Sequence, residues 1–225
     1  MTERDLHAIV LDLDDTLLDS TGLLLPAADR RSVAAMCAHG LDLAPEVALR
    51  SLHEIRSEGV WDVFRELAER HGASAECGLL GERAFFVYKV PPLDLSPRVE
   101  RALDELGALA PLALLTYGVP PVQRAKVERL GIGDRFTEQV FVDHDRGESK
   151  SDLLAHLLRS QGWDSARVVV VGDSLSSDIA AACDNGCRGV WVDGGGERAG
   201  DLAHADVRPW RTVHHVEEVT ALLTS

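Results

Sequence analysis

Short apolar runs that end in a polar residue recur along the chain and alternate with segments of helical periodicity. The runs cover residues 8–12, 112–116, 139–143, 168–173 and 189–193. Their nearly continuous Val, Ile and Leu content is typical of strands buried on both faces. The helical segments between the later runs end at glycine, as crossover helices commonly do. The pattern predicts an α/β fold with an open, doubly wound parallel sheet.

The stretch that follows the first run has a different character, because it shows helical periodicity without any strand pattern. Its four helical segments lie at about residues 26–39, 45–57, 60–71 and 76–89. A set of helices placed between two strands of one sheet is best explained as an insertion. We therefore predict an all-helical domain over 20–94, inserted into an α/β core domain formed by 1–19 and 95–225.

The acidic composition narrows the range of partners. The 225 residues include 37 Asp and Glu against 23 Lys and Arg, which gives a net charge of -14. Proteins that bind nucleic acids or anionic membranes usually do so through clustered Lys and Arg, so we expect neither a nucleic acid nor a membrane as a partner. No apolar run reaches the roughly 20 residues of a membrane span, and residues 1–7 are charged rather than apolar. We expect a cytoplasmic globular protein.

Polar side chains gather where the predicted strands end. They are Asp12 and Asp14 after the first strand, Thr116 and Tyr117 at the second, Lys150 beyond the third, and Asp173 and Asp178 after the fourth. In open α/β sheets, ligands bind in the crevice outside the carboxyl ends of the strands. Aspartate is depleted from strands and is almost never buried without a partner. We therefore expect a bound cation to neutralise the acidic cluster.

Four short segments together resemble the four motifs of the haloacid dehalogenase superfamily of hydrolases. They are DLDDT (12–16), LLTYG (114–118), Lys150 within ESKSD (148–152), and GDSLSSD (172–178). Their order and spacing also fit, and the helical insert after the first motif resembles that superfamily's cap of the first type. The resemblance spans the chain and implies a phosphatase with a Rossmann-like core, a helical cap and a Mg²⁺ cofactor.

The residue types suit phosphoryl transfer, which needs an in-line nucleophile, charge neutralisation and a proton for the leaving group. Asp12 can attack phosphorus to give an aspartyl-phosphate, which splits one hydrolysis into two displacements. Asp14, two residues later, can protonate the leaving oxygen and then deprotonate water. The expected function is hydrolysis of the phosphomonoester of a small metabolite.

The remaining motif residues have expected roles around the phosphate and the metal. Asp12 and Asp173 are candidate Mg²⁺ ligands, because Mg²⁺ prefers oxygen donors and keeps several waters. Thr116, with N–H groups near Tyr117, and Lys150 can contact phosphate oxygens. By resemblance, the Asp14 main-chain carbonyl is a further metal ligand, and Asp178 holds the metal through a water.

Other functions fit parts of this pattern. A phosphomutase shares all four motifs and differs in keeping water out of the closed site. A 2-haloacid dehalogenase shares the fold but uses neither a metal nor a second aspartate at the position of Asp14. A signalling or binding protein could carry a phospho-aspartate without turnover, although a second carboxylate at Asp14 favours hydrolysis.

The sequence leaves the substrate open among nucleoside monophosphates, sugar phosphates and phosphoglycolate, and it leaves the oligomeric state open. Specificity is expected to come from side chains of the helical insert. The candidates are Arg56, Arg65, Arg83, Tyr88 and Lys89.

Overall fold

The chain folds into two compact units. A computed structural model describes residues 6–60, 62–86, 90–143, 146–194 and 206–225. The helical unit is Ser20–Lys89, and the core unit joins Met1–Asp19 to Val90–Ser225. Residues 90–94, which the sequence pattern groups with the insertion, belong to the core unit. Among the described residues, no helix has both the length and the apolar character needed to cross a membrane.

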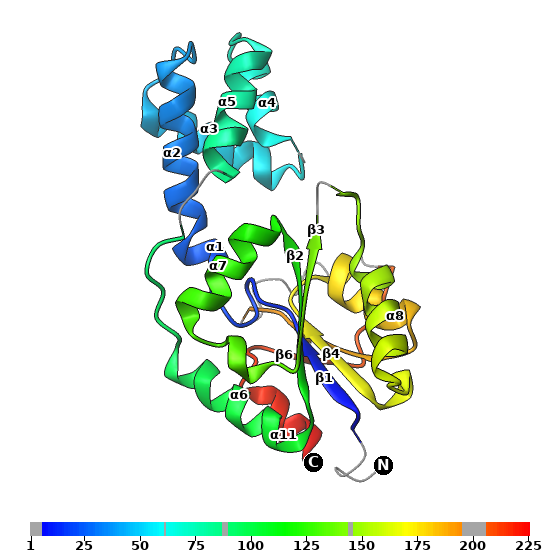
Figure 1. Cartoon of the computed structure of the whole chain (residues 1–225). Coiled ribbons are helices and arrows are strands. Elements are labelled where there is room, and N and C mark those ends of the chain that lie inside the picture. The colour runs from blue at the N-terminus through cyan, green and yellow to red at the C-terminus, as the bar shows by residue number, and fades with distance from the viewer. Residues whose placement is uncertain (1–5, 61, 87–89, 144–145, 195–205) are drawn as a thin grey trace. The chain divides into compact units, whose positions relative to one another are not determined.

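A six-stranded sheet forms the centre of the core unit. Its strand order is β3-β2-β1-β4-β5-β6, and every pairing is parallel. The strands are β1 (Ala8–Leu11), β2 (Leu112–Gly118), β3 (Glu138–Asp143), β4 (Val168–Gly172), β5 (Arg188–Val192) and β6 (Arg211–Val213). The predicted α/β class and open parallel sheet are confirmed (Figure 1).

Helices cover both faces of this sheet. They are α6 (Pro97–Leu109), α7 (Pro120–Leu130), α8 (Lys150–Gln161), α9 (Ala180–Asp184) and α11 (Glu218–Leu223). The chain steps from β1 through β2 to β3 in one direction, and from β3 through β4 to β5 in the other. Because parallel crossovers are right-handed, the two directions place helices on opposite faces. Accordingly, α6, α7 and α11 lie on one side and α8 on the other, with α9 packed against α8 (Figure 1).

The strand order reverses beside β1, and this reversal locates the site. Ile9 of β1 is level with Leu112 of β2 on one side and with Val169 of β4 on the other. All four residues of β1 are fully buried, as expected for a strand covered on both faces. The carboxyl ends of β1, β2 and β4 therefore meet at a topological switch point, where open α/β sheets bind their ligands.

The structure adds elements that the hydrophobic pattern did not predict. In β6 only Val213 is buried, so this edge strand has no continuous apolar run. Short helical turns in the described part of the chain include η2 (Gly133–Arg135), η4 (Ser165–Arg167) and η5 (Leu175–Ile179). The last is a π-helical turn, a feature found often at functional sites, and it carries Asp178.

The helical unit contains the four expected helices, preceded by one short turn. Its elements are α1 (Ser20–Leu23), α2 (Leu25–Ala38), α3 (Pro45–Ser57), α4 (Val63–Arg70) and α5 (Ala75–Phe86). The helix α4 begins later than predicted because Asp62 caps it, accepting a hydrogen bond from the Arg65 amide. Met36, Leu52 and Leu67 lie in its fully buried core.

Asp29 is a charged residue in the interior of the helical unit. Asp29 of α2 is fully buried and accepts two hydrogen bonds from the Arg56 guanidinium of α3, at 2.7 and 2.9 Å. The His53 ring, also on α3, lies 3.3 Å from the same carboxylate. Arg56, a candidate for substrate contact from its sequence position, therefore has its guanidinium bound to Asp29.

Candidate active site

A tight turn after β1 positions the first two aspartates. The Asp12 amide donates to the carbonyl of Val171, which extends the pairing between β1 and β4 by one residue. The chain then folds back, because the amides of Leu17 and Leu18 both donate to the Leu13 carbonyl, at 2.9 and 3.0 Å. Within the turn, Asp15 has a φ of 54°, a left-handed conformation that aspartate tolerates better than most residues. Asp12 therefore stands at the end of the strand, and Asp14 lies within the turn that follows it.

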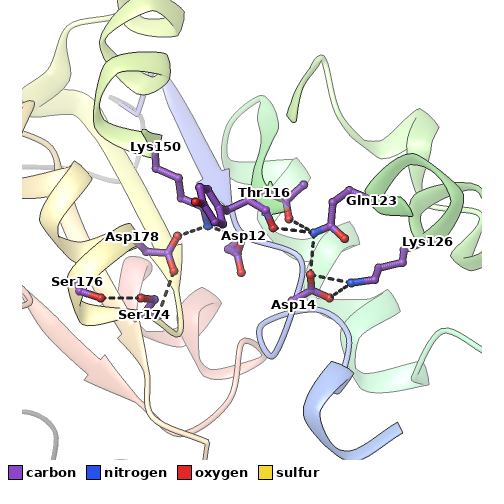
Figure 2. A network of polar contacts seen from close by, with 10 residues as sticks. Asp12, Asp14, Thr116, Gln123, Lys126, Lys150, Ser174, Ser176 and Asp178 are labelled. Carbon is purple, nitrogen blue, oxygen red and sulfur yellow. Dashed lines mark hydrogen bonds and ion pairs between the residues drawn. The ribbon is translucent and has the colours of Figure 1, made fainter. Parts of the chain in front are cut away.

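Lys150 joins two of the predicted site carboxylates. It is the first residue of α8, whose N-cap Ser149 accepts a hydrogen bond from the Asp152 amide. Its Nζ lies 2.5 Å from Asp12 Oδ1 and 2.5 Å from Asp178 Oδ1 (Figure 2). Lys150, Asp12 and Asp178 are all at least nine-tenths buried. A residue 138 positions away in the sequence is thus fixed directly against the candidate nucleophile.

The end of β4 is built around the carboxylate of Asp178. A Cβ at Gly172 would lie 2.2 Å from the Asp178 Cγ, so this position requires glycine. The Ser174 amide donates to Asp178 Oδ2 at 3.0 Å. Beside it, the indole N–H of Trp191 donates to the Asp173 carbonyl at 2.8 Å, which fixes the backbone of Asp173.

These contacts bring three carboxylates together. One oxygen from each of Asp12, Asp173 and Asp178 lies within 4.8 Å of the others. Burial raises the pKa of Asp12 well above its ordinary value; Lys150 counteracts this shift, and Asp178 and Asp173 add to it. Burial lowers the pKa of Lys150, but its attraction to Asp12 and Asp178 outweighs that effect and raises the pKa above the ordinary value.

The donor set fits a divalent cation that prefers oxygen. Among the described residues, Lys150 contacts Asp12 and Asp178, and Asp173 completes a set of three clustered carboxylates. A small, hard cation that binds oxygen atoms suits such a set of donors. The Asp14 side chain is not part of this cluster; the metal role predicted for Asp14 concerns its main-chain carbonyl.

A second group of polar contacts surrounds Thr116 at the end of β2. Thr116 is buried, and its hydroxyl accepts a hydrogen bond from the Gln123 amide at 2.7 Å. The same amide lies 3.1 Å from the Tyr117 carbonyl. Tyr117 as a residue is 37% exposed. Gln123 therefore holds the backbone and hydroxyl of the predicted phosphate-binding segment.

Asp14 is held by residues that sequence reasoning did not identify. Lys126 Nζ lies 2.6 and 2.8 Å from its two carboxylate oxygens, and Gln123 Nε2 lies 2.7 Å from Oδ2 (Figure 2). Both residues are on α7. Lys126 is one of only three lysines among 23 basic residues, but a polar residue in a helix gives no sign that it faces a buried site. The structure thus forms two neighbouring groups, one around Lys150 and one around Gln123.

Comparison with known proteins agrees with the predicted superfamily. A model of haloacid dehalogenase-like hydrolases matches residues 6–186. Phosphoglycolate phosphatase of Chromobacterium violaceum is 32% identical over 232 residues, which cover 99% of each chain. Glyceraldehyde 3-phosphate phosphatase of Pyrococcus abyssi is 31% identical over 194 residues, 83% of this chain and 81% of that protein. The named activities of both relatives are phosphatases, the branch that the sequence predicted.

A solved structure shows the same fold. The HAD hydrolase YfnB of Bacillus subtilis, bound to magnesium, is 18% identical and superposes with a TM-score of 0.69 over 98% of this chain and 99% of that one. Together, the family match over most of the core and the two relatives above 30% identity confirm the resemblance carried by the four motifs. The chain belongs to the haloacid dehalogenase-like family of hydrolases.

Proposed function

We propose that the protein is a Mg²⁺-dependent phosphomonoester hydrolase that acts on a small cytoplasmic metabolite through an aspartyl-phosphate. The observation that carries this proposal is the division of carboxylates in the site. Asp12 lies in a buried cluster with Asp173, Asp178 and Lys150, whereas Asp14 has its own separate partners. Two carboxylates in different surroundings can take different roles in one reaction.

The first displacement requires Asp12 as the nucleophile. Its carboxylate oxygen forms a bond to phosphorus while the ester P–O bond breaks, and the leaving oxygen takes a proton from Asp14. A divalent cation held by Asp12, Asp173 and the Asp14 carbonyl, with Asp178 behind a water, would supply charge that neutralises the carboxylates and the phosphate. Lys150 contributes a fixed positive charge beside Asp12.

The second displacement regenerates the enzyme. Asp14, now ionised, takes a proton from water as the water oxygen bonds to phosphorus and the bond to Asp12 breaks. Thr116 and the N–H groups near Tyr117 are the proposed contacts for the phosphate oxygens. Gln123 restrains this segment, so these groups can be in place before the substrate arrives.

The substrate proposal rests on chemistry shared by the relatives. Phosphoglycolate and glyceraldehyde 3-phosphate, the substrates in the names of two relatives, are phosphate esters of two- and three-carbon compounds. We assign selection among such esters to the helical unit, whose Arg83 is exposed while Arg56 is bound to Asp29. Tyr88 and Lys89, two other candidates, lie outside the described residues.

The test is phosphate release from a panel of phosphorylated metabolites, with Mg²⁺ and after chelation. The wild-type protein should release phosphate only with the metal, and Asp12→Asn should fall to background because the nucleophile and a metal ligand are lost. Asp134→Asn, which removes an exposed carboxylate in η2, is the matched control and should keep full activity.

The alternatives give different products in the same assays. Halide release from a 2-haloacid without metal would show a dehalogenase. Interconversion of sugar phosphate isomers without free phosphate would show a mutase. A stable phospho-aspartate with no turnover on any ester would show a signalling or binding protein, and each of these results would replace the proposal.

A further inference from the structure

Helix α7 sends two buried polar side chains toward the candidate acid–base residue. Gln123 is 2% exposed and Lys126 is 8% exposed, and they are three residues apart, so they share one helix face. In the described part of the chain, their side-chain hydrogen bonds go to Asp14, Thr116 and Tyr117. Both side chains therefore serve the loops that follow β1 and β2.

The contacts restrain both oxygens of the Asp14 carboxylate. Lys126 reaches Oδ1 at 2.6 Å and Oδ2 at 2.8 Å, while Gln123 reaches Oδ2 at 2.7 Å (Figure 2). Charge-assisted hydrogen bonds of this kind are about twice as strong as neutral ones. The Asp14 side chain is 29% exposed, so it lies at the edge of the buried region. Three hydrogen bonds from α7 restrict the orientation of its carboxylate.

Gln123 also connects Asp14 to the predicted phosphate-binding segment. Its Nε2 donates to the Asp14 carboxylate and to the Thr116 hydroxyl, both at 2.7 Å. A proton donor is effective only when it is held near the reacting oxygen, because small displacements cost much of its contribution. A link through the Gln123 amide would hold Asp14, the proposed proton donor, in a fixed position relative to the groups that contact the phosphate.

We propose that Lys126 and Gln123 are positioning residues that act through Asp14, orienting its carboxylate toward the leaving oxygen. The inference rests on the proposed phosphatase function. It divides the two buried lysines of the site between the two carboxylates, with Lys150 beside Asp12 and Lys126 beside Asp14. Neither Lys126 nor Gln123 is required to touch the substrate.

This role predicts a dependence on the leaving group. An ester with an acidic leaving group, such as 2,4-dinitrophenyl phosphate, needs little proton donation, whereas phenyl phosphate needs much more. General acid catalysis contributes roughly 10²–10⁴-fold, so loss of a positioned acid should be most visible on the poorer leaving group. The appropriate parameter is kcat/KM, because it reports the first displacement and not the later hydrolysis of the aspartyl-phosphate.

The experiment compares three variants on 2,4-dinitrophenyl, p-nitrophenyl and phenyl phosphate. Lys126→Met and Gln123→Met remove the donors at similar length, and Lys126→Arg retains a cation. We expect kcat/KM of Lys126→Met to fall about 10-fold or more on phenyl phosphate and less than about 3-fold on the dinitrophenyl ester. Gln123→Met should show the same trend, and Lys126→Arg should recover part of the loss.

Controls on other surfaces separate positioning from general damage. Arg129→Met removes an exposed cation from the same helix. Gln161→Met removes an amide that donates to Glu138 on the surface. Both should behave as the wild type does with all three esters.

A double-mutant cycle tests whether Lys126 acts through Asp14. If it does, Asp14→Asn with Lys126→Met should be no slower than Asp14→Asn alone, because the group being positioned is already lost. The inference would be overturned if the losses in kcat/KM from Asp14→Asn and Lys126→Met multiplied in the double variant. It would also be overturned if Lys126→Met lost activity equally on all three esters. In both cases, phosphate release by the wild type would still support the proposed phosphatase function. Absence of wild-type phosphate release would overturn both. If Lys126→Met does not fold, Gln123→Met and Lys126→Arg decide the result by the same criteria.

Discussion

The two units of the molecule each bury a carboxylate, but they compensate its charge differently. In the helical unit, Asp29 is paired with the planar guanidinium of Arg56 through two hydrogen bonds, and His53 lies beside them. In the core unit, Asp12 shares the single ammonium of Lys150 with Asp178, and Asp173 lies in the same cluster. The first arrangement pairs one carboxylate with one guanidinium, whereas in the second, among the described residues, one ammonium contacts two of three clustered carboxylates.

This is the difference expected between a structural ion pair and the proposed metal site. A buried carboxylate whose hydrogen bonds and charge are satisfied needs nothing further from solution. A cluster with excess charge lowers the stability of the fold unless a cation joins it, and proteins retain such clusters mainly at functional sites. Burial alone therefore does not identify the functional carboxylate; the balance of charge around it does.

The largest expected effects come from removing the basic partner in each unit. Arg56→Met should lower the free energy of unfolding by about 3–5 kcal/mol, because Asp29 is left buried without its guanidinium. Lys150→Met should instead remove activity, by about 10³-fold or more, since the charge beside Asp12, the proposed nucleophile, is lost. Denaturant unfolding and phosphate release measure the two effects.

Two further variants control this contrast. The double variant Asp29→Leu with Arg56→Met removes both charges and should recover much of the lost stability, because neither partner remains unpaired. Arg65→Met breaks an exposed ion pair with Asp62 and should change stability little. Equal destabilisation by Arg65→Met and Arg56→Met would show that the buried pair has no special role.

The next effect concerns Mg²⁺, which should stabilise the core unit and not the helical unit. A ligand at 100 times its dissociation constant raises the free energy of unfolding by about 2.7 kcal/mol if it binds only the folded state. We expect this shift in the wild type and its loss in Asp178→Asn. Arg56→Met, although less stable, should retain the shift, which calorimetry with and without Mg²⁺ can measure. An unchanged shift in Asp178→Asn would exclude this cluster as the binding site.

Much of the framework could be predicted from sequence because it depends on local patterns. The strands β1 to β5 begin and end within two residues of their apolar runs, since a buried parallel strand is apolar throughout. The motif residues could be grouped because strand ends converge in this fold class. Their proposed roles remain predictions, to be tested by the variants described above.

The rest depended on contacts between distant residues. Lys126 lies 112 residues from Asp14, and Arg56 lies 27 residues from Asp29. Both are basic residues on helices, and the sequence gives no indication of which basic residue faces a buried carboxylate. Edge strand β6 was missed for a related reason, because two of its three residues are exposed.

The smallest expected effect concerns Cys187, where the effect of burial on ionisation can be measured without a contribution from ion pairing. Burial raises the pKa of this thiol to about 11 from an ordinary value of 9.0, with no contribution from a charged neighbour. Because the folded state holds the proton more tightly than the unfolded state, the thiol's contribution to stability is fully present below pH 9 and decreases as the pH rises toward 11.

Alkylation of Cys187 by iodoacetamide should therefore be slow at pH 8 and accelerate toward pH 11, whereas the exposed Cys183 should react readily at the lower pH. Quantifying both sites by mass spectrometry over this range gives the two rates separately. Cys187→Ser should remove the slow phase and leave the fast one, and Cys183→Ser should do the reverse. Equal rates for both thiols at pH 8 would show that burial at this depth does not disfavour a thiolate, which would also weaken the argument from the buried carboxylates clustered around Asp12.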